Sequence, residues 1–326
     1  MLPSFIRKFV ICPLISLCLA STTAARSETY PNRPVRLVVP FVAGGAIDVS
    51  ARRLADYLST KTQQQFVVEN TVGASGVLGA RRVARADPDG YTLLFGTTSV
   101  YAINPAINPN VGYDPLKDYA LVARAFDSPF MLVVHPSVPV KSLSEFVNWA
   151  KANPGKLNYG SSGVGTPQHV MGELFKLNTG TEMTHVPYKG GAQSVQDVAG
   201  GHIQVLFENP LSLIPLVNDG KLTALAVTGD ARLDQAIQVP TLMEGGVNFS
   251  VTILTGIAAP AGTPQDIVNQ LNGWINDGLR DKDLLDSVAQ FGATVKPGSP
   301  EDFHDFISKE IKRWGDVARA ANIKAE

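Results

Sequence analysis

The sequence predicts an α/β fold with a mostly parallel sheet, and three observations support this class. Short apolar runs rich in β-branched residues recur along the chain. These runs are continuously apolar rather than alternating, which is typical of parallel strands covered on both faces. Segments with helical apolar spacing or helix-start signals lie between or after many of them. The expected strands are Val35–Phe41, Phe66–Glu69, Tyr91–Phe95, Met131–His135, Leu157–Tyr159, Ile203–Phe207 and Leu222–Val227.

The expected helices are marked by spacing and by capping residues. After the first strand, apolar residues recur at the helical positions Ile47, Leu54, Ala55 and Leu58. Ser142 with Glu145 forms a capping box, and Asn153-Pro154-Gly155 ends that helix. Thr263-Pro264 and Ser299-Pro300 each place an N-cap residue before a proline at the first helical position, opening the last two expected helices.

Length and charge restrict the class further. At roughly 150 residues per domain, a chain of 326 residues suggests about two domains. Apolar residues make up 44% and charged residues 17%, which is a globular rather than a disordered balance. With 28 Lys and Arg against 29 Asp and Glu, the formal net charge of -1 offers no field that would attract a phosphate backbone. Nucleic acid is therefore not expected as a partner.

The first 25 residues resemble a secretory signal peptide. Arg7 and Lys8 form a basic start, Phe9–Ala20 is mostly apolar, and small residues up to Ala25 offer a cleavage site. The apolar run is too short to cross the ~30 Å of hydrocarbon in a bilayer. An N-terminal anchor is the alternative, as is a lipoprotein attached at Cys18, although the bulky residue before this cysteine argues against the lipoprotein.

Cleavage near Ala25 would give an exported chain without thiols, because Cys12 and Cys18 both lie in the removed segment. Such a chain tolerates an oxidising compartment. The cleaved segment carries two basic residues, so the formal net charge would fall from -1 to -3. No later segment has eighteen unbroken apolar residues, and we therefore expect no membrane insertion of the mature chain.

The segments that follow the expected strands are small, hydroxylated or glycine-rich, and almost without Lys or Arg. In open parallel sheets the ligand binds beyond the carboxyl ends of the strands. Glycine allows a ligand to approach the backbone, and helix N-termini supply unpaired N–H donors, so these loops suit an anion. The alternative is that the glycines only close tight turns. The segments are Ala43–Ala46, Gly96–Ser99, Gly160–Thr166, Glu208-Asn209 and Thr228–Asp230.

Catalytic motifs are not found in the sequence. It has no G-x-x-x-x-G-K-[ST], Gly160–Gly165 does not fit G-x-G-x-x-G, and no G-x-S-x-G surrounds the loop serines. The five histidines lack metal-ligand spacing, and His169 with Glu173 is better explained as a surface pair, so we expect no metal and no cofactor. Ser162 and His169 could act as nucleophile and base, but a histidine further along the same helix would not reach back to the loop.

Asp48 leaves two interpretations open. It follows Gly45 by three residues and lies in the first turn of the expected helix, where the helix dipole favours a carboxylate. Either it only compensates this dipole, or it accepts a hydrogen bond from a ligand amine, a ligand hydroxyl or an ordered water.

A set of motifs resembles one family along essentially the whole mature chain. The opening motif, Pro40-Phe41-x-x-Gly44-Gly45-x-x-Asp48 followed by Ala51-Arg52, is similar to that of the Bug, or TctC-type, extracytoplasmic solute receptors. These receptors are the binding components of tripartite tricarboxylate transporters. Further matches follow in one collinear order: Val68–Asn70, Pro88–Leu94, Tyr113–Pro115 with Lys117-Asp118, Gly155–Gly163, His185–Gly190, Gly220–Leu222 with Ala224–Thr228, and Ala259–Pro264.

The resemblance implies a type II periplasmic binding protein of the Venus-flytrap kind, with two α/β lobes joined by crossing strands. On this pattern lobe I comprises residues 26–125 plus 251–326, and lobe II comprises residues 126–250. The implied function is capture of a small organic carboxylate between the lobes, in the periplasm, and its delivery to the membrane subunits of a tripartite transporter. We expect a monomer that is not an enzyme. An exported serine-hydrolase-like enzyme, or a receptor that feeds a signalling partner, is the alternative.

The resemblance also implies the ligand-binding residues. Those of lobe I are Phe41, Gly44, Gly45 and Asp48, with Thr97 and Thr98 beside them. Those of lobe II are Ser161, Ser162, Gly165, Thr166 and Glu208, with His169 behind the loop. Relatives often have Asp in place of Glu208, and many carry Trp near Leu254, so one wall of the cleft is expected to differ. A small dicarboxylate, an amino acid, an aromatic acid and citrate all stay open as ligands.

Overall fold

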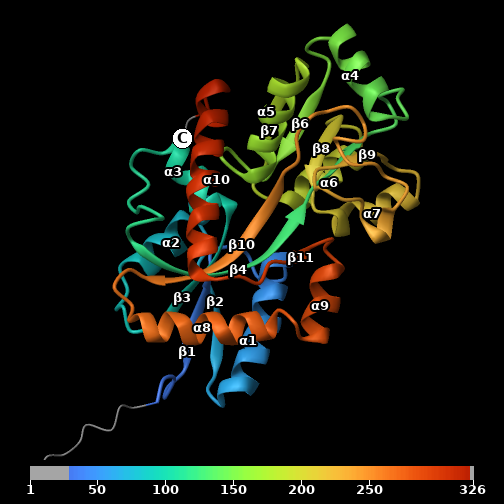
Figure 1. Cartoon of the computed structure of the whole chain (residues 1–326). Helices are drawn as coiled ribbons and strands as arrows, with labels where there is room; N and C mark the ends of the chain where they lie inside the picture. Colours follow the sequence, from blue (N-terminus) through green and yellow to red (C-terminus); the bar gives the residue numbers. More distant parts are fainter. Residues whose placement is uncertain (1–28, 324–326) are drawn as a thin grey trace, which may run out of the picture. The chain divides into compact units, whose positions relative to one another are not determined.

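A computed structural model describes residues 29–323 of the chain. From Pro31 onward these residues form one compact unit. The predicted signal segment, residues 1–25, lies outside the described part. Within residues 29–323 the chain builds two β-sheets, each with its own helices, which confirms the expected α/β class (Figure 1). Each sheet with its helices is called a lobe below.

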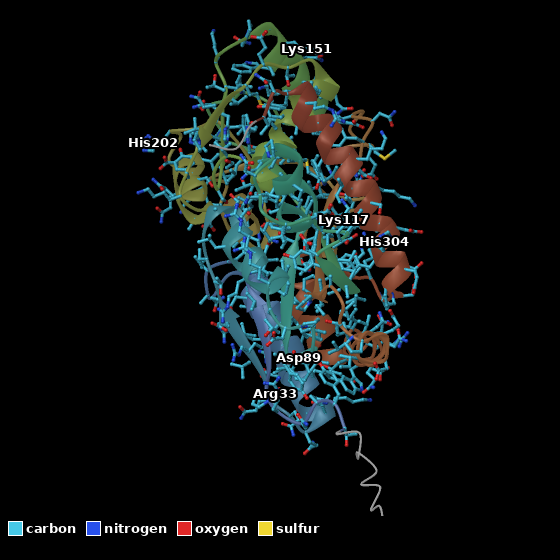
Figure 2. All side chains as sticks on the ribbon, turned by 90° about the vertical axis from the view of Figure 1, so that its left-hand side faces the viewer. Arg33, Asp89, Lys117, Lys151, His202 and His304 are labelled. Atoms are coloured by element: carbon cyan, nitrogen blue, oxygen red, sulfur yellow. The ribbon has the colours of Figure 1, made fainter. Side chains whose placement is uncertain are left out.

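The first lobe is built on a six-stranded sheet with the order β11-β4-β10-β3-β1-β2. Parallel register sets Leu37 of β1 opposite Val68 of β2 and Leu93 of β3, so the carboxyl ends of these strands meet at one edge. Below the opposite edge, Arg33 and Asp89 form an ion pair at 2.6 Å (Figure 2). The strands are β1 (Val35–Val39), β2 (Phe66–Asn70), β3 (Thr92–Thr97), β4 (Tyr119–Pro129), β10 (Thr252–Pro260) and β11 (Thr294–Val295). The helices are α1 (Ala46–Thr62), α2 (Val77–Ala84), α3 (Asn104–Ile107), α8 (Gln265–Gly278), α9 (Lys282–Ala289) and α10 (Pro300–Ala320), with the short turns η1 (Ala74–Gly76) and η2 (Ser99–Ile103).

The second lobe is built on a five-stranded sheet with the order β7-β6-β8-β5-β9. Its strands are β5 (Met131–Val134), β6 (Asn158–Ser161), β7 (Thr184–Pro187), β8 (Val205–Glu208) and β9 (Thr223–Val227). Its helices are α4 (Leu143–Ala152), α5 (Pro167–Thr179), α6 (Gly191–Ala199) and α7 (Pro210–Asn218), with the short turn η3 (Asp234–Ala236). The carboxyl ends of β6 and β8 open into the loops that begin α5 and α7.

Both sheets are mixed, so the prediction of a mostly parallel sheet is wrong. The parallel pairs are β1–β2, β1–β3, β6–β7 and β6–β8. Every antiparallel pair includes β4 or β10, which cross between the lobes, or β5, which follows β4 directly. These pairs are β10–β3, β10–β4, β11–β4, β5–β8 and β5–β9. A strand covered on both faces is apolar whatever the direction of its neighbours, and the apolar pattern therefore does not report strand direction.

Two long strands carry the chain between the lobes. β4 ends at Pro129, and after the single residue Phe130 the chain enters β5 of the second sheet. β10 brings the chain back and pairs antiparallel with β4 along its length (Figure 1). Thr228 ties the two passages together, because its hydroxyl accepts a hydrogen bond from Phe130 N–H at 2.8 Å and its carbonyl accepts one from Val251 N–H at 2.7 Å. Position 125 lies inside β4, and position 251 directly precedes β10.

The last helix, α10, packs in the cores of both lobes. Phe303 and Ile307, near its start, lie in the core of the first lobe together with residues of β1 and β3. Trp314 and Val317, near its end, lie in the core of the second lobe together with residues of β5 and α5. The segment 251–326, expected in lobe I, therefore includes a helix whose second half packs in the other core.

The capping signals position most of the expected helix starts. Ser142 and Ser299 cap α4 and α10 as predicted, each accepting a hydrogen bond from the backbone N–H three residues on. The complete capping box is found at α10, whereas at α4 the Glu145 carboxylate accepts from the N–H that precedes the cap. α8 begins one residue later than expected, with Pro264 as its cap, because the Thr263 hydroxyl donates back to a carbonyl.

Candidate functional site

A cavity of about 470 Å³ lies between the two lobes and is lined by residues of both. Its first-lobe wall combines large apolar side chains with hydroxyl groups, whereas its second-lobe wall is mainly polar. The apolar side chains of the first lobe are Phe41, Val42, Ile47, Val72, Phe126, Ile253 and Phe291. The hydroxyl groups of the first lobe are those of Ser50, Ser75, Thr97, Ser99, Ser128 and Thr255. The second-lobe wall includes Ser162, Thr166, Gln168, Lys189, Glu208 and Asn209.

Helix N-termini of both lobes face this cavity. The N-cap residues of α2, α5, α6 and α7, which are Gly76, Thr166, Gly190 and Asn209, line it together with Ala46, the first residue of α1. At α1, α2, α5 and α6 no side chain of the N-cap residue accepts from the first N–H groups. Helix N-termini carry partial positive charge and unpaired donors, so this arrangement suits an anionic group.

The loop between β1 and α1 is held from behind by Asp48. This side chain is 2% exposed, and its carboxylate accepts hydrogen bonds from Gly44 N–H at 2.9 Å, from two nitrogens of Arg52 at 3.0 Å, and from Asn70 Nδ2 at 2.9 Å. Asn70 also donates to the carbonyl of Phe41. Burial opposes the charge of Asp48, but the hydrogen bonds from Arg52, Gly44 and Asn70 lower its pKa below the usual value. Of the two interpretations left open by the sequence, the structure favours a residue that shapes the loop, because protein donors occupy its acceptor positions.

The loop between β6 and α5 is held from behind by two histidines. Ser161 Oγ lies 2.6 Å from His185 Nε2 and also exchanges hydrogen bonds with the backbone of Gly163. His169 Nδ1 accepts a hydrogen bond from Gly165 N–H at 3.1 Å. The two imidazole rings stack with their centroids 3.8 Å apart. His169 therefore lies behind the loop, as the resemblance implied.

Both of these histidines are neutral at neutral pH. Burial lowers the pKa of His185 to about 3, and the nearby His169 and Lys176 add to this effect. Burial also lowers the pKa of His169, although Glu173 opposes the shift. The loop between β6 and α5 is thus supported by stacked, uncharged rings.

A polar network covers the second-lobe wall around Glu208. Gln168 Nε2 donates to Ser162 Oγ at 3.0 Å and to Glu208 Oε2 at 3.1 Å, and Asn209 N–H donates to Glu208 Oε1 at 2.8 Å. Glu208 also lies against the first residue of α6, since a Cβ added at Gly191 would be 2.6 Å from its Oε2. The side chain is 8% exposed, and burial raises its pKa even though both hydrogen bonds favour the charged form.

The predicted site residues separate into those that line the cavity and those that lie behind it. Phe41, Thr97, Ser162, Thr166 and Glu208 line it. Gly44, Asp48, Ser161 and Gly165 belong to the supports behind the two loops. Gly45 is the N-cap residue of α1, next to the lining residue Ala46. Thr98 turns into the core, where its hydroxyl accepts a hydrogen bond from Leu254 N–H at 2.9 Å.

Leu254 itself does not line the cavity, although its neighbours in the same segment do. Successive side chains of a strand point to opposite faces, and along β10 it is Ile253 and Thr255 that line the cavity. Leu254 is fully buried in the core of the first lobe. The other departure from the family pattern, Glu208, does lie in the cavity.

Several lining residues were not predicted from the sequence. Gln168 lies in the first turn of α5, and Lys189 lies in the loop that leads to α6, where it is exposed at the cavity. Phe126 comes from the crossing strand β4, and Phe291 follows α9. The segment His185–Gly190 was noted as a motif, but only the fold shows that its lysine reaches the cavity.

The geometry gives no support to a serine hydrolase. Ser162 Oγ accepts its hydrogen bond from Gln168, while His169 Nδ1 accepts one from the backbone. Ser161 does contact His185, but Ser161 is fully buried and no substrate could reach it. Among residues 29–323 no group of three or more His, Cys, Asp and Glu side chains could hold a metal ion. None of the helices in this part of the chain has the length and hydropathy of a membrane span.

A second hollow, of about 680 Å³, lies in the second lobe alone. It is lined by the start of α4 and by Arg232 and Glu244, which pair with each other at 2.8 Å. A single helix begins there, whereas helices of both lobes begin at the cavity between the lobes, so this hollow suits an anionic ligand less well.

Comparison with known structures defines the class of the protein. The chain is similar to "R. palustris Rpa4515 with adipate", with 37% identity, a TM-score of 0.82 and coverage of 90% of this chain and 99% of that one. It is also similar to "MatC (Rpa3494) from Rhodopseudomonas palustris with bound malate", with 32% identity, a TM-score of 0.79 and coverage of 88% and 99%. The chain has the two-lobed fold of the periplasmic binding proteins, as the resemblance implied.

Sequence comparison defines the family. Residues 50–323 match the family described as "Tripartite tricarboxylate transporter family receptor", TctC. Protein BugT of Bordetella pertussis is 35% identical over 300 residues, which is 91% of this chain and 92% of that protein. The chain belongs to the TctC family of solute receptors.

Proposed function

We propose that this protein captures a small organic carboxylate in the cavity between its lobes and delivers it to the membrane subunits of a tripartite transporter. The observation that carries the proposal is the convergence of four helix starts without side-chain caps, from both lobes, on one cavity. Two relatives whose solved structures hold adipate and malate support the choice of a carboxylate. A hydrogen bond to a charged group contributes about 1.5–3 kcal/mol, so four or five such donors, less the cost of ordering, would support micromolar binding at about -8 kcal/mol.

The proposed binding residues follow from the lining rather than from the motifs alone. Backbone N–H groups at Ala46 and Gly191 and the hydroxyl of Ser162 would hold the ligand. The ligand bridges two walls that belong to different lobes, and closure of the lobes on the ligand would bury it. We propose a division of the chain into lobe I, residues 26–125 plus 251–326, and lobe II, residues 126–250. The first boundary falls inside the crossing strand β4, whose last residues still pair in the first sheet, and the end of α10 is shared.

The cellular setting of the proposal is the periplasm. The chain would be exported with cleavage near Ala25, would act as a soluble monomer, and would reach the membrane only through its partner subunits. Its role would be binding rather than catalysis, in keeping with a family of receptors.

The role of backbone donors can be tested with Ala46→Pro. Proline is tolerated at the first position of a helix and lacks the N–H, and Gly45 before it already has the extended backbone that proline requires (φ -76°, ψ 167°). The variant should unfold at the same temperature as the parent and bind its carboxylate about tenfold or more weakly. Ala46→Ser, which keeps the N–H, is the matched control.

The measurement is a thermal-unfolding screen of the mature chain against dicarboxylates, amino acids, aromatic acids and citrate, followed by titration calorimetry of the hits. A ligand present at a hundred times its Kd stabilises the folded state by about 2.7 kcal/mol. The proposal fails if only sugars or cations raise the unfolding temperature. Unchanged affinity in Ala46→Pro would show that the carboxylate is held elsewhere.

A further inference from the structure

The cavity is more apolar than capture of a highly charged metabolite requires. Phe41, Phe126 and Phe291 line it from three separate segments of the first lobe, and Val72 and Ile253 extend the same wall. Ligand sites are matched to their ligands by apolar surface as well as by a few placed polar groups. A small metabolite with polar groups on every carbon would leave this wall in contact with water, whereas an apolar body would cover it.

Glu208 places a fixed acceptor on the opposite wall. Its two oxygens accept one hydrogen bond each from protein donors, which leaves about half of the acceptor positions of a carboxylate open. No Lys, Arg or His among residues 29–323 forms an ion pair with it within 4.0 Å. A buried carboxylate without a counter-charge is unfavourable, so a cationic donor on the ligand would relieve it.

Positive potential is found elsewhere in the same cavity. The starts of α1 and α2 face it from the first lobe, and Lys189 reaches it from the second. A carboxylate can therefore bind at one position and an ammonium group at another. Building on the proposed function, we infer that the ligand of this site is an amino acid with an apolar side chain, whose ammonium group binds Glu208.

Two other ligand classes fit these observations less well. A dicarboxylate would bring a second carboxyl group next to Glu208, and one of the two would have to be protonated. A hydroxy acid would supply a hydrogen bond to Glu208 but no neutralising charge. The amino acid alone satisfies the apolar wall, the acceptor and the positive helix starts together.

The test uses sets of ligands that differ by one group. L-phenylalanine and L-leucine are compared by titration calorimetry with 3-phenylpropanoate and 4-methylpentanoate, which lack the amino group, with phenethylamine, which lacks the carboxylate, and with adipate. The two amino acids should bind about tenfold or more tightly than every analogue. Phenethylamine should bind weakly, because the helix starts would then face no anion.

Glu208→Gln and Glu208→Asp separate the charge from the shape of the side chain. Glu208→Gln should lose the preference for the amino acid over its deaminated analogue, and Glu208→Asp should keep a part of it. Glu182→Gln, which changes an exposed residue of the second lobe, is the matched control and should behave as the parent. Unfolding temperatures of all variants are measured, and Glu208→Asp keeps the test decisive if Glu208→Gln does not fold.

The outcomes distinguish this inference from the proposed function. Equal or tighter binding of the deaminated analogues or of adipate, or an unchanged preference in Glu208→Gln, overturns the amino-acid assignment and leaves carboxylate capture standing. Failure of every carboxylate, with or without an amino group, overturns the proposed function itself.

Discussion

The two loops that bring helix starts to the cavity look alike in sequence but are supported in different ways. The loop before α1 is held by a charged group, the Asp48 carboxylate, which binds Arg52, Asn70 and a backbone N–H. The loop before α5 is held by neutral groups, the stacked rings of His169 and His185. In each loop, some residues that suggested ligand contact fix the backbone, such as Asp48 and Ser161, while Phe41 and Ser162 face the cavity.

This difference teaches that a ligand-binding loop can be made rigid with or without charge. In the charged support, the Arg52 guanidinium pairs with the Asp48 carboxylate at 3.0 Å and compensates its charge. The neutral support depends on burial that keeps both imidazoles uncharged. The two loops should therefore respond differently to substitution and to pH, which the following experiments test.

The largest expected effect comes from substituting a glycine with positive φ, compared at one such position in each loop. Gly165 has φ +74°, and a Cβ added there would lie 2.2 Å from Ile107 Cδ1, whereas Gly44 has φ +81° and nothing within 4 Å. Gly165→Ala should reduce the free energy of unfolding by about 2–4 kcal/mol, and Gly44→Ala by about 1 kcal/mol. Urea denaturation of both variants measures the difference. Equal losses would mean that the loop before α5 has room to shift away from α3.

The next effect is loss of the charged support. Asp48→Ala leaves the Gly44 N–H and the Asn70 amide without their acceptor, and should cost about 2 kcal/mol in the free energy of unfolding. Carboxylate affinity should fall as well, since Ala46 and Phe41 lose their fixed positions. Asp56→Ala, an exposed change on the same helix, is the control and should alter neither quantity. An Asp48→Ala variant of parental stability would contradict the support described for this loop.

The smallest effect is a pH dependence between pH 6.5 and 5, which the neutral support should produce, whereas Asp48, with its lowered pKa, is protonated only in more acidic solution. The unfolded chain protonates His185 near pH 6.5, but the folded chain does so only near pH 3, so folding loses stability as the pH falls below about 6.5. Above that pH this residue contributes no pH dependence. The slope is at most about 1.4 kcal/mol per pH unit, and it should shrink in His185→Phe between pH 6.5 and 5.

His202→Asn is the control for this pH experiment. His202 is exposed on the second lobe (Figure 2). Its replacement should leave the slope unchanged. If His185→Phe keeps the full slope, other groups account for the acid sensitivity of the fold.

Much of the fold could be predicted from the sequence because each expected strand is a continuous apolar run. The run at residues 35–41, for example, became β1, which ends two residues earlier at Val39. β4 and β10 were expected only as crossing strands implied by the resemblance. Polar residues such as Arg124 and Asp127 interrupt β4, so it has no continuous apolar run. The apolar pattern does not encode strand direction either. The prediction of a mostly parallel sheet was therefore wrong, and both sheets are mixed.

The site was predicted less completely, for a geometric reason. The motifs located the two loops. They did not show which side chains face the cavity, because that depends on where each residue lies in the repeat of the neighbouring strand or helix. Thr97 and Thr98 are adjacent and chemically identical, yet Thr97 lines the cavity and Thr98 is fully buried in the core. Gln168 and Phe291 reach the same cavity from segments far apart in the sequence, and no local pattern brings them together.

The position of α10 has a consequence for the order in which the chain becomes native. Phe303 fills one core and Trp314 fills the other, and both residues belong to the segment that is synthesised last. Neither lobe can therefore finish its packing while the end of the chain is missing, although most of the second lobe is encoded well before it. A chain truncated ahead of α10 would leave two incomplete cores rather than one damaged lobe beside an intact one.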